Sequence, residues 1–370
     1  MNSLTKLIHD IIKDKNFISI KHFINLALYH PTLGYYQKKN PFGMGGDFVT
    51  APQISSLFNE LISLFFIYQF KKNWKEGMKV YFIELGPGNG FFIKDFLTLA
   101  SKIENLKNNL EVILVEISEN LQAEQKKYIT ELKTDIPVSW HTNTLEALNT
   151  ITDSDDNLIF TFSNEFFDAF PINQYIKYQN KWHEVCIVKN EKEDEKLEFG
   201  FTHFDYRTAI RNHLQLLGYD EENINDGEII EISNDVIEIF YELSKKIKRN
   251  KGTILTIDYG YLQTQFSSSL QSLKNHQYNN VLDNIGEADI TYLVNFELLF
   301  NIAVDVKLHA FPPITQKDFL TSIGIIEKLN LLFNKTTDEV KKHLLKTSTD
   351  RLISEAQMGS LFKVFICENY

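Results

Sequence analysis

The fold is decided by the stretch Val80-Tyr81-Phe82-Ile83-Glu84-Leu85-Gly86-Pro87-Gly88-Asn89-Gly90. A run rich in β-forming residues ends in an acid, glycines follow at 86, 88 and 90, and the segment 91–99 then repeats apolar residues with helical period. This order predicts a strand, a tight turn and a helix. Glycines let the backbone approach a ligand closely, and the start of a helix offers unpaired N–H groups and the positive end of its dipole to a carboxylate or phosphate.

Short β-rich runs alternate with amphipathic segments from residue 79 onward, which predicts a Rossmann-like α/β fold with parallel strands joined by crossover helices. Apolar residues at helical spacing over 235–248 predict the crossover helix before the fourth strand. Two alternating runs, 174–178 and 182–188, flank Gln179-Asn180-Lys181 and are expected to form an inserted hairpin. The expected strands of the sheet are 80–85, 111–116, 158–163 and 253–258, with a last β-rich run at 361–367.

Residues 1–75 are expected to form N-terminal helices and a lid loop. Ser19 and Ser55 each precede an apolar segment with helical period, so we expect both to cap helices. Residues 40–54 hold three glycines and two prolines, a composition that predicts a tightly turning loop. The main domain is expected over 76–370, with insertions at about 171–226 (hairpin and helix) and 259–295 (a long polar loop over the site).

The charge balance argues against a nucleic-acid partner, because the formal net charge is -11 and Lys and Arg do not cluster among aromatic residues. Cys186 and Cys367 lie far apart with no neighbouring ligand at metal spacing, so we expect no metal site and interpret both as core residues. The apolar stretch 61–70 is about half of the roughly 20 residues that span a bilayer, so no membrane insertion is expected. Residues 1–15 lack a signal-peptide pattern, and the expected location is the cytoplasm.

The glycine turn predicts a binding site for S-adenosylmethionine. Dinucleotide folds place a third glycine three positions after the second, where this chain has Phe91. The observed G-x-G-x-G, preceded by Glu84, is typical of S-adenosylmethionine sites, and Glu116 ends the next strand, where a carboxylate can bind ribose hydroxyls. The alternative is a tight turn that binds no ligand. The expected cofactor-binding residues are Gly46, Asp47, Glu84, Gly86, Pro87, Gly88, Gly90, Glu116 and Ile117.

The polar segment 163–171, directly after the third strand, is the candidate site of methyl transfer. The reaction needs in-line positioning and the removal of competing charge and water, and it needs no metal. Asn164 offers a donor and an acceptor, and the carboxylates of Glu165 and Asp168 would face one way in a helical turn and suit the five donors of a guanidinium. These three residues are the expected catalytic residues. The alternative is that the two acids cap the next helix or hold structural hydrogen bonds.

Three further residues, Thr50, Pro52 and His276, are expected on the substrate side. Asp47 lies in the lid loop, where it either forms an Asx turn or contacts the cofactor or substrate. His276 lies in the long loop, where it is either an exposed residue or a base, because an imidazole titrates near neutrality.

Taken together, these motifs resemble the MidA-like methyltransferases, whose mitochondrial members include a complex I assembly factor that methylates an arginine. The resemblance implies a seven-stranded sheet with a reversed last strand, an appended helical and loop region, and a protein arginine as the acceptor, dimethylated symmetrically in characterised members. The matching segments are 30–36, 46–52, 84–90, 115–118, 164–171, 258–260 and 358–364. The departures from the family pattern are Asn59, Asn89, Leu293 and Asn295, in place of Gly, Arg, His and Asp.

Several functions stay open on this basis. The first is methylation of an arginine on a respiratory complex I subunit or another protein, which the intact Asn164, Glu165 and Asp168 favour. The second is an assembly protein that keeps the cofactor pocket without turnover, and the third is transfer to a small-molecule nitrogen or oxygen. A homodimer is compatible with the sequence. Because the resemblance begins near residue 7, a bacterial cytoplasmic protein is expected rather than one of the mitochondrial matrix.

Overall fold

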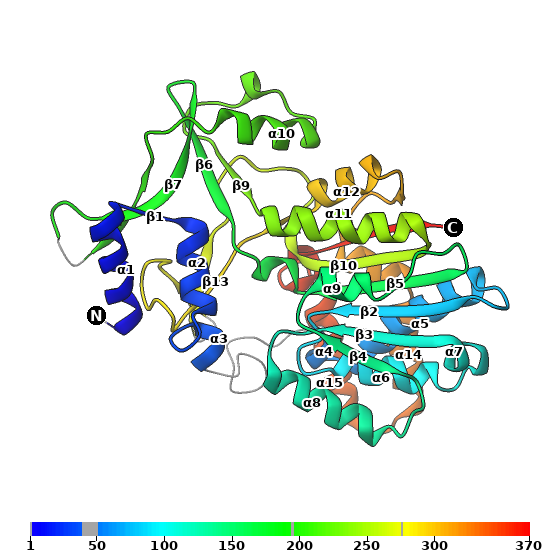
Figure 1. Cartoon of the computed structure of the whole chain (residues 1–370). Coiled ribbons are helices and arrows are strands. Elements are labelled where there is room, and N and C mark those ends of the chain that lie inside the picture. The colour runs from blue at the N-terminus through cyan, green and yellow to red at the C-terminus, as the bar shows by residue number, and fades with distance from the viewer. Residues whose placement is uncertain (1, 39–50, 194–195, 275–276) are drawn as a thin grey trace. The chain divides into compact units, whose positions relative to one another are not determined.

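The computed structural model describes residues 2–38, 51–193, 196–274 and 277–370, and the chain forms two compact units (Figure 1). Each unit is assembled from three stretches of chain. The first unit consists of Met1–Phe48, Phe167–Ile237 and Gln263–Leu298, and the second of Val49–Phe166, Glu238–Leu262 and Leu299–Tyr370. The segments expected as insertions in the main domain therefore belong largely to the first unit.

A mostly parallel sheet forms the centre of the second unit, with the strand order β15-β17-β10-β5-β2-β3-β4 and the short β16 also beside β17. Strands β4, β3, β2, β5 and β10 run parallel, whereas β17 runs antiparallel to β10. The strands are β2 (Lys79–Leu85), β3 (Leu110–Val115), β4 (Val138–His141), β5 (Asn157–Asn164), β10 (Lys251–Tyr261), β15 (His309–Ala310), β16 (Ile314–Thr315) and β17 (Phe362–Asn369).

The central strands form because their sequences can be buried on both faces. All of β5, and all of β2 after Lys79, is buried, as in parallel strands that are covered by helices on both sides. Helices α5 (Ser56–Asn73) and α6 (Phe91–Ala100) share one core with these strands. In that core the ring of Phe66 meets Phe82 edge to face, with centroids 5.0 Å apart. The glycine turn between β2 and α6 thus connects a buried strand to a buried helix.

The other helices of the second unit connect the strands or follow them. The crossover helix predicted over 235–248 is present as α11 (Asn234–Arg249), which begins in the first unit, ends directly before β10 and buries Phe240, Leu243 and Ile247. The remaining helices are α4 (Ala51–Ile54), α7 (Glu104–Asn109), α8 (Glu119–Glu131), α9 (Thr144–Asn149), α12 (Phe296–Asp305, which begins in the first unit), α13 (Gln316–Ser322), α14 (Ile325–Lys335), α15 (Glu339–Ile353) and α16 (Met358–Leu361).

The first unit contains an antiparallel sheet, β1-β7-β6-β9 with β8 beside β7, and a smaller sheet, β12-β11-β13. Two N-terminal helices pack against the larger sheet, where Phe23 and Ile187 share one core. The elements are α1 (Ser3–Lys15), β1 (Ile18–Ser19), α2 (Ile20–Tyr29), α3 (Tyr35–Lys38), η1 (Phe167–Ala169), β6 (Asn173–Tyr178), β7 (Lys181–Lys189), β8 (Leu197–Phe201), α10 (Arg207–Leu217), η2 (Glu221–Asn223), β9 (Ile229–Ile232), β11 (Gln271–Lys274), β12 (Gln277–Asn279), β13 (Asp289–Thr291) and β14 (Val294–Asn295).

Several local predictions are confirmed. The hairpin β6–β7 is antiparallel and turns at Gln179 and Asn180, which both have positive φ as a tight two-residue turn requires. Ser19 caps α2 by accepting from the His22 N–H at 3.2 Å, and Ser55 caps α5 by accepting from the Leu57 N–H at 3.2 Å. The turn and the two helix caps could be predicted because each depends on residues that are neighbours in the sequence.

Three predictions differ from the structure. The region 259–295, expected as a loop, contains the sheet β12-β11-β13, whose strands are only three or four residues long and mostly polar, so they carry a weak apolar pattern. Strand β4 was not expected, because all four of its residues are only partly buried. Helix α5, expected with the N-terminal region over 1–75, lies in the second unit because its apolar side chains pack into the core of that unit.

The two cysteines can be compared with the expectation that they are core residues. Cys186 and Cys367 are both buried and free, as expected for core residues. Within the described ranges, no helix is long and apolar enough to cross a membrane. The same residues contain no group of three or more His, Cys, Asp or Glu side chains that could hold a metal ion.

Candidate cofactor and transfer site

The three glycines of the turn are not required for the same reason. All have positive φ: 65° at Gly86, 53° at Gly88 and 75° at Gly90. A Cβ on Gly86 would lie 3.0 Å from the Phe166 ring, and a Cβ on Gly90 would lie 2.9 Å from the Gln125 Cγ, whereas a Cβ on Gly88 would meet nothing within 4 Å. Gly88 is therefore the glycine that leaves space open to a ligand, and the other two make room for the protein's own side chains.

Two buried acids stand at the ends of the strands beside this turn. Glu84 on β2 is 4% exposed, and burial, followed by repulsion from Glu116, raises its pKa well above the usual value. Glu116 follows β3 and accepts from the Ser118 N–H at 2.8 Å. Burial raises the pKa of Glu116 to about 7, against the lowering effect of the N–H groups of Ser118 and Ile117. Two neighbouring carboxyl groups in a buried setting are typical of a functional site rather than of a stable core.

Three buried oxygens at the carboxyl ends of β2 and β5 accept no hydrogen bond from the described residues: Glu84 Oε2, Asn89 Oδ1 and Asn164 Oδ1. Leaving buried polar atoms unpaired is costly, so such atoms indicate a polar ligand or water. Ile117, beside Glu116, is 63% exposed and presents an apolar surface at the same edge of the sheet. Hydrogen-bond acceptors together with an apolar surface fit a ligand that has an amino group, hydroxyls and an aromatic ring, as S-adenosylmethionine does.

The transfer segment begins at the last residue of β5. Asn164 donates to Glu165 Oε1 at 3.0 Å, and the Tyr259 hydroxyl donates to Glu165 Oε2 at 3.1 Å. Asp258 holds the next residue by accepting from the Phe166 N–H at 3.1 Å. Glu165 itself has a φ of 54°, which is uncommon for a residue with a side chain and which its surroundings must stabilise. The strained backbone and two donors thus hold the carboxylate in one orientation.

Asp168 lies in the 3₁₀ turn η1 of the first unit and accepts from the Thr291 hydroxyl at 3.2 Å. The backbone of the same turn is held at two carbonyls, Phe167 by Tyr292 at 2.9 Å and Ala169 by Tyr29 at 2.5 Å. The expected helical turn is therefore present in 3₁₀ form. Glu165 belongs to the second unit and Asp168 to the first, so the joint role expected of the two acids stays a prediction.

As far as the lid loop, the long loop and the substrate side are concerned, only Pro52 of the other expected residues belongs to the part of the chain that the structure describes. Gly46, Asp47, Thr50 and His276 lie outside the described residues. Pro52 lies in α4, and its carbonyl accepts from the Asn59 side chain at 3.2 Å. The same amide donates to Asp95 at 2.9 Å, so Asn59, which departs from the family pattern, ties α5 to α4 and α6.

Sequence reasoning missed two residues of the site. Tyr259 donates a hydrogen bond to Glu165. It lies in Asp258-Tyr259-Gly260, a segment that matches the family pattern, but the match alone does not indicate what the side chain does. Gln125, which donates to the Gly88 carbonyl at 2.7 Å, had no signal, because it lies in the middle of α8, 37 residues away along the chain.

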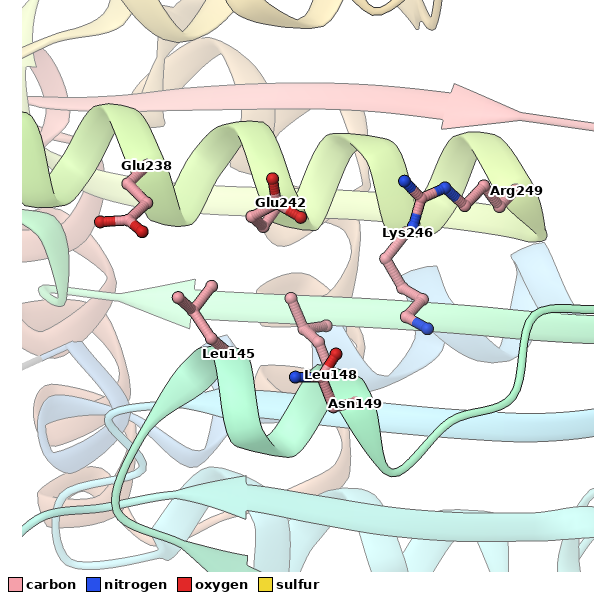
Figure 2. Close-up of a pocket in the computed structure, with 7 residues that line it drawn as sticks. All are labelled: Leu145, Leu148, Asn149, Glu238, Glu242, Lys246 and Arg249. Atoms are coloured by element: carbon pink, nitrogen blue, oxygen red, sulfur yellow. The ribbon is translucent and has the colours of Figure 1, made fainter.

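A separate pocket lies between α9 and α11 (Figure 2). Its lining is Leu145, Leu148, Asn149, Glu238, Glu242, Lys246 and Arg249, which includes none of the predicted site residues. Lys246 also has a structural role there, because its ammonium donates to Asp153 at 2.6 Å and to the Ile151 carbonyl at 2.7 Å. The candidate site is therefore the edge of the sheet at the glycine turn and not this pocket.

A mostly parallel sheet, a glycine turn after β2 and an acid after β3 fit the class of methyltransferases that use S-adenosyl-L-methionine. A family model of S-adenosyl-L-methionine-dependent methyltransferases matches residues 61–314. The chain belongs to this family, in its MidA-like group. The predictions of the enzyme class and of its cofactor are thereby confirmed.

Relatives extend over almost the whole chain. The protein arginine methyltransferase NDUFAF7 of Danio rerio mitochondria is 30% identical over 94% of this chain and 82% of its own length. The Homo sapiens protein of the same name is 28% identical over 96% of this chain and 80% of its own. The crystal structure of a COG1565 superfamily member from Burkholderia thailandensis, bound to S-adenosyl-homocysteine, has a TM-score of 0.77 at 21% identity and covers 99% of this chain and 92% of its own.

Proposed function

We propose that this enzyme methylates an arginine side chain of a protein. The observation that carries the proposal is the Glu165 carboxylate, which Asn164 and Tyr259 hold in one orientation at the carboxyl end of β5. A fixed carboxylate suits the planar donors of a guanidinium. The name of the Danio rerio relative, a protein arginine methyltransferase, supports the same acceptor.

The cofactor supplies an electrophilic methyl group when it is bound, and this chain holds and orients it. We assign the ribose hydroxyls to Glu116, the amino group to Glu84 and the adenine ring to the apolar surface of Ile117. The open space at Gly88 admits the amino-acid end of the cofactor. The strand order β15-β17-β10-β5-β2-β3-β4, with β17 antiparallel, supports an interpretation as the seven-stranded methyltransferase sheet with a reversed last strand.

On the acceptor side, Glu165 would bind the guanidinium and align one nitrogen with the methyl group. The new nitrogen–carbon bond forms as the sulfur–carbon bond breaks. The sulfur keeps the electron pair of the broken bond and S-adenosylhomocysteine leaves, while the attacking nitrogen releases a proton to solvent. Alignment contributes much of the rate in such a reaction, because the reacting groups are held in the geometry of attack. Glu165 is therefore assigned to acceptor binding, and Asn164 and Tyr259 to its orientation.

We place the acceptor on a protein, with a respiratory complex I subunit as the leading candidate and the bacterial cytoplasm as the site of action. The formal net charge of -11 favours a basic, arginine-bearing segment over an acidic one. The mitochondrial proteins named NDUFAF7 support the link to complex I. We also propose, separately from the chemistry, that two copies of this chain associate into a homodimer.

The test is transfer of a labelled methyl group from S-adenosylmethionine to paired peptides that differ only in Arg or Lys, with mass spectrometry to locate the label. We expect label on the Arg peptides with the wild type and at least about a hundredfold less with Glu165→Gln, whose cofactor binding stays close to that of the wild type. Cofactor binding without transfer to any peptide or protein would favour the assembly role. Label on small amines alone would contradict a protein acceptor.

A further inference from the structure

Gln125 is a fully buried polar residue that the assignments above leave without a role. It projects from the middle of α8, the helix after Glu116, and its side chain is 0% exposed. A buried amide is costly unless its donors and its acceptor find partners. The partners of Gln125 therefore show what this side chain holds in place.

One partner fixes the orientation of the amide. The indole N–H of Trp140, on β4, donates to Gln125 Oε1 at 2.9 Å. An indole nitrogen can only donate, so the amide oxygen must face Trp140 and the amide nitrogen must point away from it. Trp140 is thus the reason that the amide cannot turn over.

The amide nitrogen points into the cofactor site. Gln125 Nε2 donates to the Gly88 carbonyl at 2.7 Å. The same side chain also lies beside Glu116, where it lowers the pKa of that carboxyl group against the effect of burial. Gly90 makes the approach possible, because a Cβ at that position would collide with the Gln125 Cγ. One side chain therefore touches the glycine turn and the acid assigned to the ribose.

We propose that Gln125 is a positioning residue for S-adenosylmethionine: its amide, oriented by Trp140, fixes the Gly88 carbonyl and the Glu116 carboxylate relative to each other. The cofactor must contact the turn and the acid at the same time, so their relative placement sets its affinity. The proposal rests on the assignment of Glu116 to the ribose. The experiment below tests the role of Gln125 and the ribose assignment separately.

The experiment is calorimetric binding of S-adenosylmethionine to the full chain between pH 6 and 9. In the wild type we expect the affinity to fall as the pH drops below about 7, because burial raises the pKa of Glu116 to about 7 and the ionised carboxylate is the form assigned to the hydroxyls. Gln125→Leu removes the bond to the Gly88 carbonyl and the amide that lowers the pKa of Glu116. We therefore expect affinity at pH 7 to fall at least about tenfold and the midpoint of the profile to move to higher pH. Trp140→Phe should move the midpoint in the same direction.

The matched control is Gln122→Leu. Gln122 lies one turn earlier on α8 and donates to the backbone carbonyl of Glu116 at 2.8 Å, so its loss removes a hydrogen bond to the same residue without touching the carboxylate. Neighbouring elements carry other charged groups: Glu84 on β2, His141 on β4, and Glu119 and Lys126 on α8. Each profile is repeated in a His141→Gln background, which removes this ionisable side chain from the comparison.

The outcomes separate the possible failures. A shifted midpoint in Gln125→Leu and Trp140→Phe, with Gln122→Leu unshifted, supports the proposal. A uniform loss of affinity with no shift in midpoint overturns it and leaves Gln125 a packing role. If Gln125→Leu does not fold, Trp140→Phe tests the proposal: a midpoint at higher pH supports it, and an unshifted midpoint overturns it. If Glu116→Gln binds with wild-type affinity and pH dependence, the ribose assignment itself is wrong.

Discussion

Replacing Gly88 or Gly90 by Ala should separate the ligand-facing glycine from the structural one. Both positions have positive φ, so an added side chain strains the backbone by roughly 1–2 kcal/mol in each case. The Cβ of Gly88→Ala meets nothing within 4 Å, so strain is its whole cost to stability. The Cβ of Gly90→Ala lies 2.9 Å from the Gln125 Cγ, and Gln125 cannot withdraw because its amide is bonded at both ends.

Overpacking of this kind typically costs about 1–3 kcal/mol, so Gly90→Ala should lose that much more stability than Gly88→Ala. The assay is urea unfolding without cofactor, followed by circular dichroism. Cofactor affinity should respond differently, because the methyl group of Gly88→Ala enters the open space at the turn. We expect its affinity for S-adenosylmethionine to fall at least about tenfold by calorimetry, which is about 1.4 kcal/mol.

Two results would refute this reasoning. Equal losses of stability in the two variants would mean that Gln125 yields to the new methyl group. Wild-type cofactor affinity in Gly88→Ala would mean that the space beside Gly88 is not part of the cofactor site.

Three further predictions concern the acids. Burial raises the pKa of Glu84 in the folded state, so the contribution of this group to stability is present at acid pH and is lost as the pH rises from the unfolded-state pKa through the folded-state pKa. Glu84→Gln should therefore unfold at a higher urea concentration than the wild type at pH 8 and show no gain at pH 4. The same variant should bind the cofactor more weakly. Tyr259→Phe keeps the ring against Phe362, 4.2 Å between centroids, but loses the bond to Glu165; we expect unchanged cofactor affinity by calorimetry and a kcat at least about tenfold lower, and an unchanged kcat would exclude an orienting role. Glu165→Gly and Glu165→Ala both lose the bonds from Asn164 and Tyr259, but only Gly relieves a φ of 54°. Both should abolish transfer, and Glu165→Gly should have a free energy of unfolding about 1 kcal/mol higher than Glu165→Ala in urea titrations; equal values would show that the conformation is not strained.

Features that depend on neighbours in the sequence were predictable. The hairpin turn at Gln179-Asn180 and the caps at Ser19 and Ser55 each act over two or three residues. The glycine turn was equally readable, since a β-rich run, spaced glycines and a helical period all pointed to the same structure.

Features that depend on distant partners were not predictable. Gln125 meets Gly88 only because α8 folds back over the sheet, and nothing near Gln125 in the sequence indicates that contact. The positive φ of Glu165 contradicts the preference of its residue type and is held by bonds from Asn164 and from Tyr259, 94 residues later. Short, mostly exposed polar strands such as β12 have no apolar alternation that would indicate them in the sequence.

The path of the chain limits how this protein can be divided. The polypeptide passes from one unit to the other five times, after residues 48, 166, 237, 262 and 298. Neither unit can be expressed as one continuous fragment, and a single cut by a protease leaves most of the connections intact. A simple truncation removes a piece of one unit or of both, so the boundaries of a minimal catalytic fragment cannot be found by shortening the ends. One of these passages lies within the transfer segment, between Phe166 and Phe167. A fragment that contains only one unit would therefore lack part of this segment.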